Sequence, residues 1–306
     1  MNPHLDIAPG VREALAARRP VVALESTVIA HGMAYPQNLE TALSVEAIVR
    51  AGGAMPATIA VIGGRLKAGL SEAEIAHIAK ANDVMKATVR DLPYLAATAR
   101  DGATTVAATM RIAALAGIAV FATGGIGGVH RGAAQTFDIS ADLTEMAASR
   151  VAVVAAGAKS ILDIGATLER LETLGVPVVV YGADRFPAFY SRDSKFTAPQ
   201  RLDSTTEIAR MMQAQWSTGF GGGLLIANPI PAADEISAAI IDKAIEQAVA
   251  EMERQGIGGK EATPYLLAKV AAITGGASLK ANMALIRHNA KVAAEIAVAF
   301  AALRDR

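Results

Sequence analysis

A carboxyl group and an amine each lie close to the end of an apolar run in this sequence. Glu25 follows the run Pro20–Leu24, and Lys159 lies shortly after Val151–Val154, where a helix is expected to begin. Apolar surroundings raise the pKa of a carboxyl group and suit it to proton transfer. An amine in an apolar, glycine-flanked segment could add to a carbonyl as the uncharged nucleophile. From position alone, Glu25 could equally cap a helix, and Lys159 could reach solvent from a first helical turn.

A glycine-rich segment, Thr123–Gly132 (TGGIGGVHRG), follows another apolar run. Glycines let the backbone approach a ligand closely and direct N–H groups at an anion. The spacing matches neither the G-x-G-x-x-G pattern nor the Walker pattern, because no Gly-Lys-Ser/Thr follows. The segment is therefore either part of a binding site or a tight strand-to-helix turn.

Two aspartates flank a serine in the segment TFDISAD. Asp138, Ser140 and Asp142 could hold a hard cation such as Mg²⁺ or Mn²⁺, or they could cap the helix that follows. A zinc site is not expected, because no cluster of histidine and cysteine is present.

Further basic side chains could bind or orient a ligand. Lys86, in a short apolar stretch, is a candidate phosphate or carboxylate binder, with surface placement as the alternative. His31 and His130 lie near glycines, where each could be an orienting group or a purely structural histidine.

The elements that must position these residues are short apolar runs alternating with helices. Such runs are typical of strands buried on both faces of a mainly parallel sheet. The pattern predicts a three-layer α/β/α fold, and ligands in such folds bind beyond the carboxyl ends of the strands. Helix caps are expected at Ser71 and Ser204. The six runs that predict strands are Pro20–Leu24, Thr58–Ile62, Ile118–Phe121, Val151–Val154, Val176–Tyr181 and Gly223–Ala227.

The last third of the chain is predicted to be helical. Helices are expected at about 234–255, 263–274 and 278–303, separated by glycines. Because no Pro/Ser-rich linker precedes them, the sequence predicts one domain over residues 1–306 with a helical C-terminal layer around a mixed, mainly parallel sheet.

Composition excludes several classes of protein. Lys+Arg 29 balances Asp+Glu 29, so neither a nucleic acid nor an acidic membrane is an expected partner. The chain has no cysteine and hence no disulfide, and its long apolar stretches are interrupted by glycine, proline and polar residues. Without a continuous membrane span or a secretory signal at the start, a soluble cytoplasmic protein is expected. Abundant alanine with few aromatic residues is common in oligomers.

A set of motifs extends the argument beyond single residues. Together they resemble the pseudouridine-5′-phosphate glycosidase family, also called indigoidine synthase A-like, from about residue 20 to 304. The motifs are VVALESTVIAHGM (21–33), PATIAVIGG (56–64), RDLP (90–93), GATTVAATM (102–110), FATGGIGGVHRGA (121–133), TFDISADL (136–143), AGAKSILD (156–163), ANPIP (227–231) and GKEATPYLLA (259–268).

The resemblance implies reversible cleavage of the C–C glycosidic bond of pseudouridine 5′-phosphate, which gives uracil and ribose 5-phosphate. By the same resemblance Glu25 is the proton donor and acceptor, Lys159 the nucleophile and Asp138 a ligand of a divalent metal, typically Mn²⁺. The family forms trimers with an α/β/α fold. The resemblance implies substrate contacts at Lys86, the backbone around Val106, Ser140, Ala141 and Asp142, with Thr123, His130 and Asn282 as further candidates.

The residue types fit this chemistry. A C-glycoside would leave as a poor carbanion, so a lysine adduct at C1′ that becomes an iminium provides an electron sink. The usual pair of carboxylates in glycosidases is not needed for this route. Two alternatives use the same residues: an aldolase-type Schiff-base lyase acting on another sugar phosphate, and a nucleotide-binding regulator without catalysis.

Overall fold

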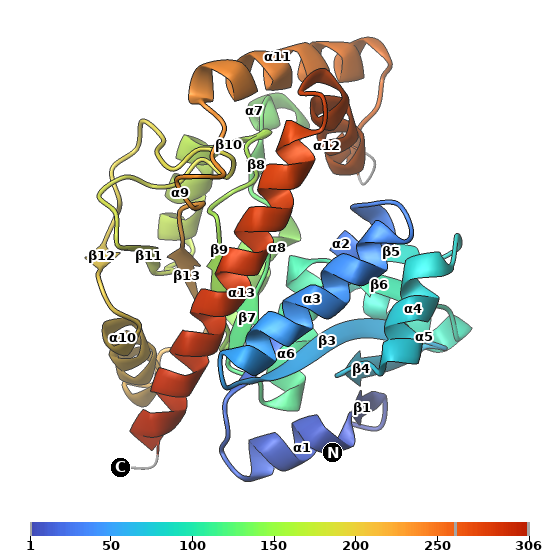
Figure 1. Cartoon of the computed structure of the whole chain (residues 1–306), viewed down its shortest axis with the longest axis vertical. Coiled ribbons are helices and arrows are strands. Elements are labelled where there is room, and N and C mark those ends of the chain that lie inside the picture. The colour runs from blue at the N-terminus through green and yellow to red at the C-terminus, as the bar shows by residue number, and fades with distance from the viewer. Residues whose placement is uncertain (1, 260–261, 305–306) are drawn as a thin grey trace.

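A mixed, mainly parallel sheet forms the centre of the molecule (Figure 1). The computed structural model describes residues 2–259 and 262–304. Strands β4 and β6 run antiparallel to β3, β5 pairs with β6 in parallel, and the other pairs along the sheet are parallel. The strand order is β1 (Leu5–Ile7), β4 (Arg65–Ala68), β3 (Met55–Ile62), β2 (Val21–Leu24), β7 (Val120–Ala122), β9 (Ala152–Ala155), β13 (Leu224–Ala227), β11 (Val178–Tyr181) and β12 (Arg201–Leu202), with β5 (Met85–Ala87) and β6 (Gly102–Thr104) beside β3.

The central strands form because short, mostly β-branched and alanine-rich runs are covered on both faces. Every residue of β2, β7, β9 and β13 is buried. Each of the six predicted runs overlaps a strand, and the prediction of a mainly parallel sheet is confirmed. The register pairs Leu24 with Ala122, and Ala122 with Val154. Glu25, Thr123 and Ala155 therefore lie side by side at the carboxyl ends of three neighbouring strands.

Helices cover both faces of the sheet, as the predicted three-layer arrangement requires. One face carries α3 (Gln37–Ala51), α10 (Thr205–Ser217) and α13 (Ala277–Arg304), and the other carries α6 (Val106–Ala116) and α8 (Ala141–Ala148) (Figure 1). The remaining helices are α1 (Pro9–Ala16), α2 (Thr27–His31), α4 (Glu72–Lys80), the 3₁₀ helix η1 (Val89–Asp91), α5 (Leu92–Thr98), α7 (Ala133–Thr136), α9 (Ile164–Thr173), α11 (Ala238–Arg254) and α12 (Ala262–Ile273).

The predicted helix signals are present in the structure. Ser71 caps α4 in a capping box with Glu74, and the Ser204 hydroxyl accepts a hydrogen bond from the Glu207 N–H at the start of α10. The C-terminal helices α11, α12 and α13 form as predicted, and α13 packs against β2, β7 and β9. Among the described residues, no helix is both long and apolar enough to cross a membrane.

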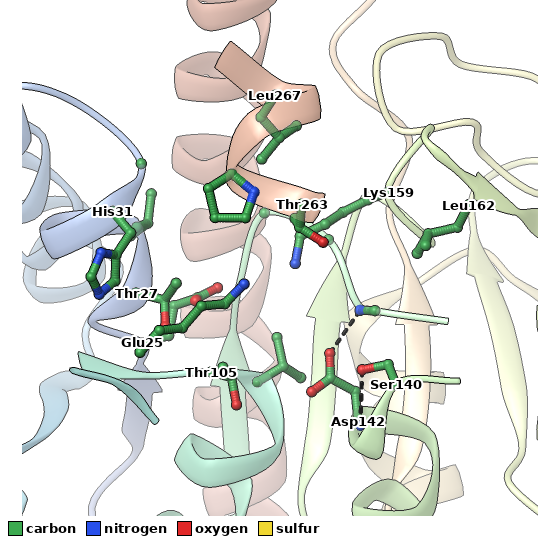
Figure 2. Close-up of a pocket in the computed structure, with 18 of the residues that line it drawn as sticks. Glu25, Thr27, His31, Thr105, Ser140, Asp142, Lys159, Leu162, Thr263 and Leu267 are labelled. Atoms are coloured by element: carbon green, nitrogen blue, oxygen red, sulfur yellow. Dashed lines mark hydrogen bonds between the residues drawn. The ribbon is translucent and has the colours of Figure 1, made fainter. Parts of the chain in front are cut away.

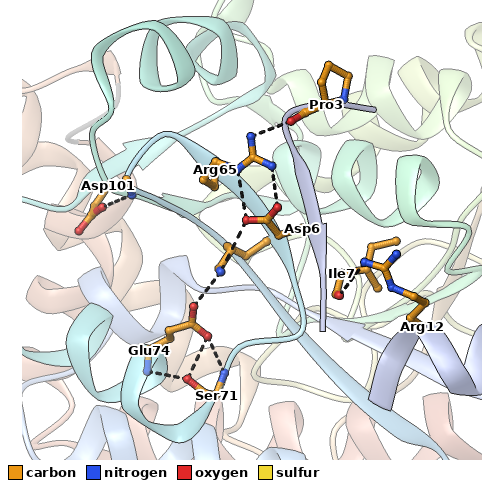
Figure 3. A network of polar contacts seen from close by, with 10 residues as sticks. Pro3, Asp6, Ile7, Arg12, Arg65, Ser71, Glu74 and Asp101 are labelled. Atoms are coloured by element: carbon orange, nitrogen blue, oxygen red, sulfur yellow. Dashed lines mark hydrogen bonds and ion pairs between the residues drawn. The ribbon is translucent and has the colours of Figure 1, made fainter. Parts of the chain in front are cut away.

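Exposed ion pairs connect the N-terminal strand β1 to β4 (Figure 3). The Arg65 guanidinium donates to the Asp6 carboxylate from Nε at 3.2 Å and from Nη2 at 2.6 Å. Lys67 continues the network to Glu74 on α4, at 3.0 Å. Because the side chains of Arg65 and Asp6 are 42% and 41% exposed, each pair contributes little stability on its own. β1 is held in the sheet by its backbone pairing with β4, and the ion pairs add side-chain contacts at this edge.

Candidate active site

A cavity of about 640 Å³ opens at the carboxyl ends of β2, β7 and β9 (Figure 2). Glu25 enters it from β2, Gly124 from β7 and Lys159 from the loop after β9. This is the edge of the sheet at which the sequence predicted ligand binding. The structure brings together on the cavity wall Glu25, Lys86, Val106, His130, Asp138, Ser140, Ala141, Asp142, Lys159 and Asn282.

Glu25 lies between the cavity and an apolar wall. Its Oε1 accepts a hydrogen bond from the hydroxyl of Thr123 on the neighbouring strand end. Behind it, a hollow of about 30 Å³ is lined mainly by apolar side chains such as Ile29 and Ile286. Burial raises the pKa of Glu25, although the charge of Lys159 and the hydroxyl of Thr123 act in the opposite direction. A carboxyl group in this state is suited to donating and accepting a proton closer to neutral pH.

The Lys159 side chain projects into the same cavity from the opposite side to Glu25 and His31 (Figure 2). Its backbone N–H donates to the Ile126 carbonyl at 3.1 Å, and the Ile126 N–H donates to the Gly157 carbonyl at 3.1 Å. These bonds join the loop that carries the amine to the glycine-rich segment, so both loops are fixed relative to each other.

The prediction that Lys159 opens a helix is wrong. Lys159 lies in a loop, followed by the short strand β10 (Leu162–Asp163), and α9 begins only at Ile164. Gly157 has φ +81°, a left-handed conformation, and a Cβ atom there would lie 2.7 Å from the Pro187 carbonyl oxygen. A helix cannot begin through that residue without a backbone change. The amine is consequently not opposed by a helix macrodipole.

The glycine-rich segment forms part of the cavity wall rather than a tight strand-to-helix turn. After β7 it continues to the short strand β8 (Val129–His130), which pairs with β10. A Cβ atom at Gly127 would lie 2.3 Å from Ser140 Oγ, and one at Gly128 would lie 2.3 Å from Thr167 Oγ1. The glycines are needed because two other segments pack directly against this backbone.

Asp142 connects three walls of the cavity. Its Oδ1 accepts a hydrogen bond from the Ala107 N–H at 2.8 Å, and its Oδ2 accepts one from the Gly127 N–H at 2.7 Å. Ser140 caps α8, since its hydroxyl accepts from the Asp142 N–H at 3.2 Å. Of the two sequence alternatives, capping is therefore confirmed for Ser140. The Asp142 carboxylate holds the first turn of α6, where Val106 lies, against the glycine-rich segment.

Asp138 is a separate case, because its carboxylate is open to the cavity. Its side chain is 41% exposed, and the nearest ring nitrogen of His130 is 4.0 Å away. Over residues 2–259 and 262–304, no three His, Cys, Asp or Glu side chains are grouped as a protein-only metal cage. A single open carboxylate fits a hydrated Mg²⁺- or Mn²⁺-type ion that keeps several waters, and it does not fit a structural zinc ion.

Positive charge lies at the edge of the cavity near β5 and α2. Lys86 on β5 and His31 at the end of α2 both line the wall, with Arg90 beside them. Burial, together with the Lys86 charge, lowers the pKa of His31, while a contact with the Val84 carbonyl acts the other way. A neutral histidine beside a lysine cation suits an anionic end of a substrate, which Lys86 would bind electrostatically.

Helices α13 and α12 complete the outer wall. Ser278, Asn282 and Ile286 follow one another at intervals of four residues, so one face of α13 points into the cavity. The Asn282 side chain lies against Gly124, with Oδ1 3.4 Å from the position of a Cβ atom there. Apolar residues of α12, including Leu267, line the cavity beside them (Figure 2).

Several lining or supporting residues were not identified from the sequence. Thr27, Thr105 and Tyr190 also line the cavity, and Asn289 holds the glycine-rich segment from behind. Thr105 could have been recognised as a helix cap, since its hydroxyl accepts from the Ala108 N–H at 3.5 Å. Asn289 carries a weaker signal, a polar residue among the mainly apolar residues of the buried side of α13.

The fold and the site together define an α/β enzyme whose pocket combines a partly buried carboxyl group with a lysine amine. The chain belongs to the indigoidine synthase A-like family, whose sequence profile matches residues 10–299.

Close relatives and solved structures extend this assignment over nearly the whole chain. The pseudouridine-5′-phosphate glycosidase of Hahella chejuensis is 60% identical over 98% of this chain and 99% of its own length. That of Escherichia coli K12 is 57% identical over 96% and 94%. The prealnumycin C-glycosynthase AlnA, solved with ribulose 5-phosphate, has a TM-score of 0.92 at 40% identity, covering 100% and 99% of the two chains. An indigoidine synthase A-like protein of Thermotoga maritima has a TM-score of 0.88 at 36% identity, covering 96% and 95%.

Proposed function

We propose that this enzyme reversibly cleaves the C–C glycosidic bond of pseudouridine 5′-phosphate to give uracil and ribose 5-phosphate. The observation that carries the proposal is the meeting of Glu25 and Lys159 in one cavity at the carboxyl ends of β2 and β9. The named activity of relatives that are 57–60% identical over nearly their full length supports the substrate. AlnA supports both C-glycoside chemistry and a five-carbon sugar phosphate as ligand, because its structure contains ribulose 5-phosphate.

The proposed reaction begins with opening of the ribose ring. Glu25, whose pKa is raised by burial, donates a proton from its acid form to the ring oxygen as the Lys159 amine adds at C1′. The C1′–O bond breaks, C1′ is then bonded to both the lysine nitrogen and C5 of uracil, and the Glu25 carboxylate accepts the proton that the lysine nitrogen loses.

Cleavage of the C–C bond follows from this adduct. Glu25 returns this proton to C5 of uracil, and the nitrogen lone pair then forms a C=N bond to C1′ as the C1′–C5 electron pair restores the C5=C6 double bond of the departing uracil. Water then hydrolyses the imine, which releases ribose 5-phosphate and restores the amine. The lysine adduct avoids expulsion of a free carbanion, the step with the highest activation free energy in a direct cleavage of the C–C bond.

Other residues of the wall would bind and orient the substrate. Lys86 would bind the phosphate as a cation, and Asn282 and the Ser140–Asp142 segment would contact the remaining polar groups. Asp138 would hold a divalent cation such as Mn²⁺, which would supply positive charge to organise water and anionic groups in the cavity. The resemblance to the family favours a homotrimer, which sedimentation velocity on the purified protein would measure.

The test is incubation of the enzyme with pseudouridine 5′-phosphate and Mn²⁺, with uracil release followed by its absorbance after separation. Lys159→Ala should abolish release. Ribose 5-phosphate with borohydride should leave a mass adduct on the peptide containing Lys159, and Lys243→Ala, which changes an exposed lysine on α11, should leave that adduct in place. An active Lys159→Ala variant without an adduct on the wild type would reject the lysine intermediate.

A further inference from the structure

The segment that contacts Glu25 is held from behind by a buried side chain of α13. Asn289 Nδ2 donates hydrogen bonds to the Thr123 carbonyl at 2.7 Å and to the Gly124 carbonyl at 3.2 Å. Asn289 has no exposed surface, and it lies three residues along α13 from Ile286, which lines the cavity. The same short segment thus carries the hydroxyl that contacts Glu25, a backbone that faces the cavity, and the acceptors for this amide.

A second asparagine fixes the orientation of the first. Asn228, which follows β13 and is 2% exposed, donates from Nδ2 to Asn289 Oδ1 at 2.9 Å. Its own N–H donates to the Ala155 carbonyl at 2.8 Å. Because two carbonyl groups accept from Asn289, its Nδ2 must face them and its Oδ1 must face Asn228. The two amides therefore join α13 to the ends of β7, β9 and β13.

Without this amide the segment keeps its bonds to β9, in which the Thr123 N–H donates to the Val154 carbonyl at 3.0 Å and the Ala156 N–H donates to the Gly124 carbonyl at 2.9 Å. The Thr123 carbonyl would lose its donor, and a buried carbonyl without a partner is costly enough to favour rotation of the peptide. A shift of Thr123 that brings its carbonyl to another donor moves the Cα atom as well, and this changes the position of the Thr123 hydroxyl relative to Glu25. Buried polar networks in which every group has a hydrogen-bond partner favour a single arrangement. In Asn289, Nδ2 has two acceptors and Oδ1 has one donor.

We propose that Asn289 is a positioning residue for the reaction. It fixes the peptide between Thr123 and Gly124, so that the Thr123 hydroxyl donates to Glu25 and the backbone of Gly124 keeps its place in the cavity wall. The inference rests on the proposed function, because it assigns Asn289 a role through the acid–base group named there.

The kinetic test compares Asn289→Ala with a matched control. Gln215 on α10 also donates one amide nitrogen to two consecutive carbonyls, those of Gly222 at 3.4 Å and Gly223 at 3.0 Å, but at the amino end of β13. Asn289→Ala should lower kcat by about 10- to 100-fold with a smaller change in KM, as expected when a catalytic group is misplaced. Gln215→Ala should keep kcat within about twofold of the wild type. Equal kcat in the Asn289→Ala variant and the wild type would overturn the proposal.

A double-mutant cycle identifies the route of the effect. If Asn289 acts through Thr123, Asn289→Ala should cost less than about twofold in kcat when it is added to Thr123→Val. The same 10- to 100-fold loss in both backgrounds would contradict the proposed route. Asn228→Ala leaves the donor of Asn289 in place and removes only its orienting partner, so it should lower kcat less than Asn289→Ala. It also provides a readout if Asn289→Ala does not fold.

A measurement without substrate separates this inference from the proposed function. The Glu25 pKa can be followed by ¹³C NMR, and loss of the Thr123 hydrogen bond should raise it further in Asn289→Ala but not in Gln215→Ala. The charged groups that act on Glu25 are Lys159, Lys86 and Asp142, and none of them is changed in either variant. An unchanged Glu25 pKa in Asn289→Ala rejects the positioning role. Failure of the wild type to release uracil rejects the proposed function and leaves this result unaffected.

Discussion

Glu25 and Glu145 are both glutamates that accept a hydrogen bond from a hydroxyl group, yet their surroundings differ. Glu145 on α8 accepts from the Ser149 hydroxyl and from Arg111 of α6, whose Nε and Nη2 donate at 2.9 and 2.8 Å. The hydrogen bond to Glu145 raises the pKa of Arg111. Glu25 accepts from the Thr123 hydroxyl, and burial raises its own pKa. One carboxylate has a bidentate guanidinium partner, and the other faces lysines across a cavity.

This difference separates a structural group from a reactive one. A two-bond pair with a guanidinium fixes charge and geometry, and it joins two helices of the same layer. A carboxyl group whose pKa is raised by burial is suited to proton transfer, and burial raises the pKa of Glu25. The same residue type therefore joins two helices at one place and, in the proposed function, transfers a proton at the other.

The largest effect should come from removing the acid at Glu25. Glu25→Gln keeps the shape of the side chain and one acceptor for Thr123, but it cannot transfer a proton. Turnover should fall by about 10²- to 10⁴-fold, measured as uracil release, with an unchanged circular dichroism spectrum. Near-normal turnover of Glu25→Gln would show that Glu25 transfers no proton in the reaction, and that it does not differ from Glu145 in function.

The converse experiment removes the negative charge of Glu145. Glu145→Gln leaves Arg111 with one neutral acceptor, so the free energy of unfolding should fall by about 1–3 kcal/mol. The loss is smaller than for a fully buried pair because the Arg111 side chain is 43% exposed. Urea titration measures this change, and turnover below the melting transition should stay within about twofold. Loss of turnover at unchanged stability would show that Glu145 also serves the site.

A smaller effect concerns the pH dependence of stability. Because the folded pKa of Glu25 is raised above 4.5, the folded state binds more protons than the unfolded state above that pH. Wild-type stability relative to Glu25→Gln should therefore fall as pH rises from about 4.5 through the folded pKa. Melting temperatures should favour Glu25→Gln more at pH 7 than at pH 4. A difference that is constant with pH would argue against a raised pKa.

The smallest effect, with the opposite sign, is expected at the surface network of β1. The hydrogen bond from Arg65 lowers the pKa of Asp6, so its contribution to stability is present above the unfolded pKa and is lost as pH falls through the folded value. Asp6→Asn should cost at most about 1 kcal/mol at neutral pH, and less in high salt. Melting curves at two salt concentrations measure the stability lost in Asp6→Asn. A large loss that does not depend on salt would show that this network stabilises the fold as the Arg111–Glu145 pair does.

The sequence predicts the strands well because burial on both faces leaves a strong signal. Continuous apolar runs predicted β2, β9 and β13, and placement at strand ends predicted that Glu25 would reach a ligand cavity. The family motifs then supplied most of the other lining residues. These features depend on local composition and spacing, which a sequence displays directly.

The remaining features depend on contacts between distant segments. The sequence around Lys159 did not predict the short strand β10 that follows it, because β10 forms by pairing with β8, a distant segment. Asp142 resembles a cap or a cation ligand locally, yet its carboxylate is used by N–H groups of Ala107 and Gly127. Asn289 is one polar residue in a long helix, and its role depends on carbonyls far away in the chain.

The docking of α13 has a consequence for the chain during its synthesis. Glu25 emerges from the ribosome early and Lys159 midway, whereas the residues of α13 that close the cavity and hold the glycine-rich segment emerge last. A nascent or proteolytically shortened chain that lacks this helix is therefore missing one side of the cavity. The pocket that encloses Lys159 is therefore complete only after the last helix of the chain has been made and has packed against the sheet.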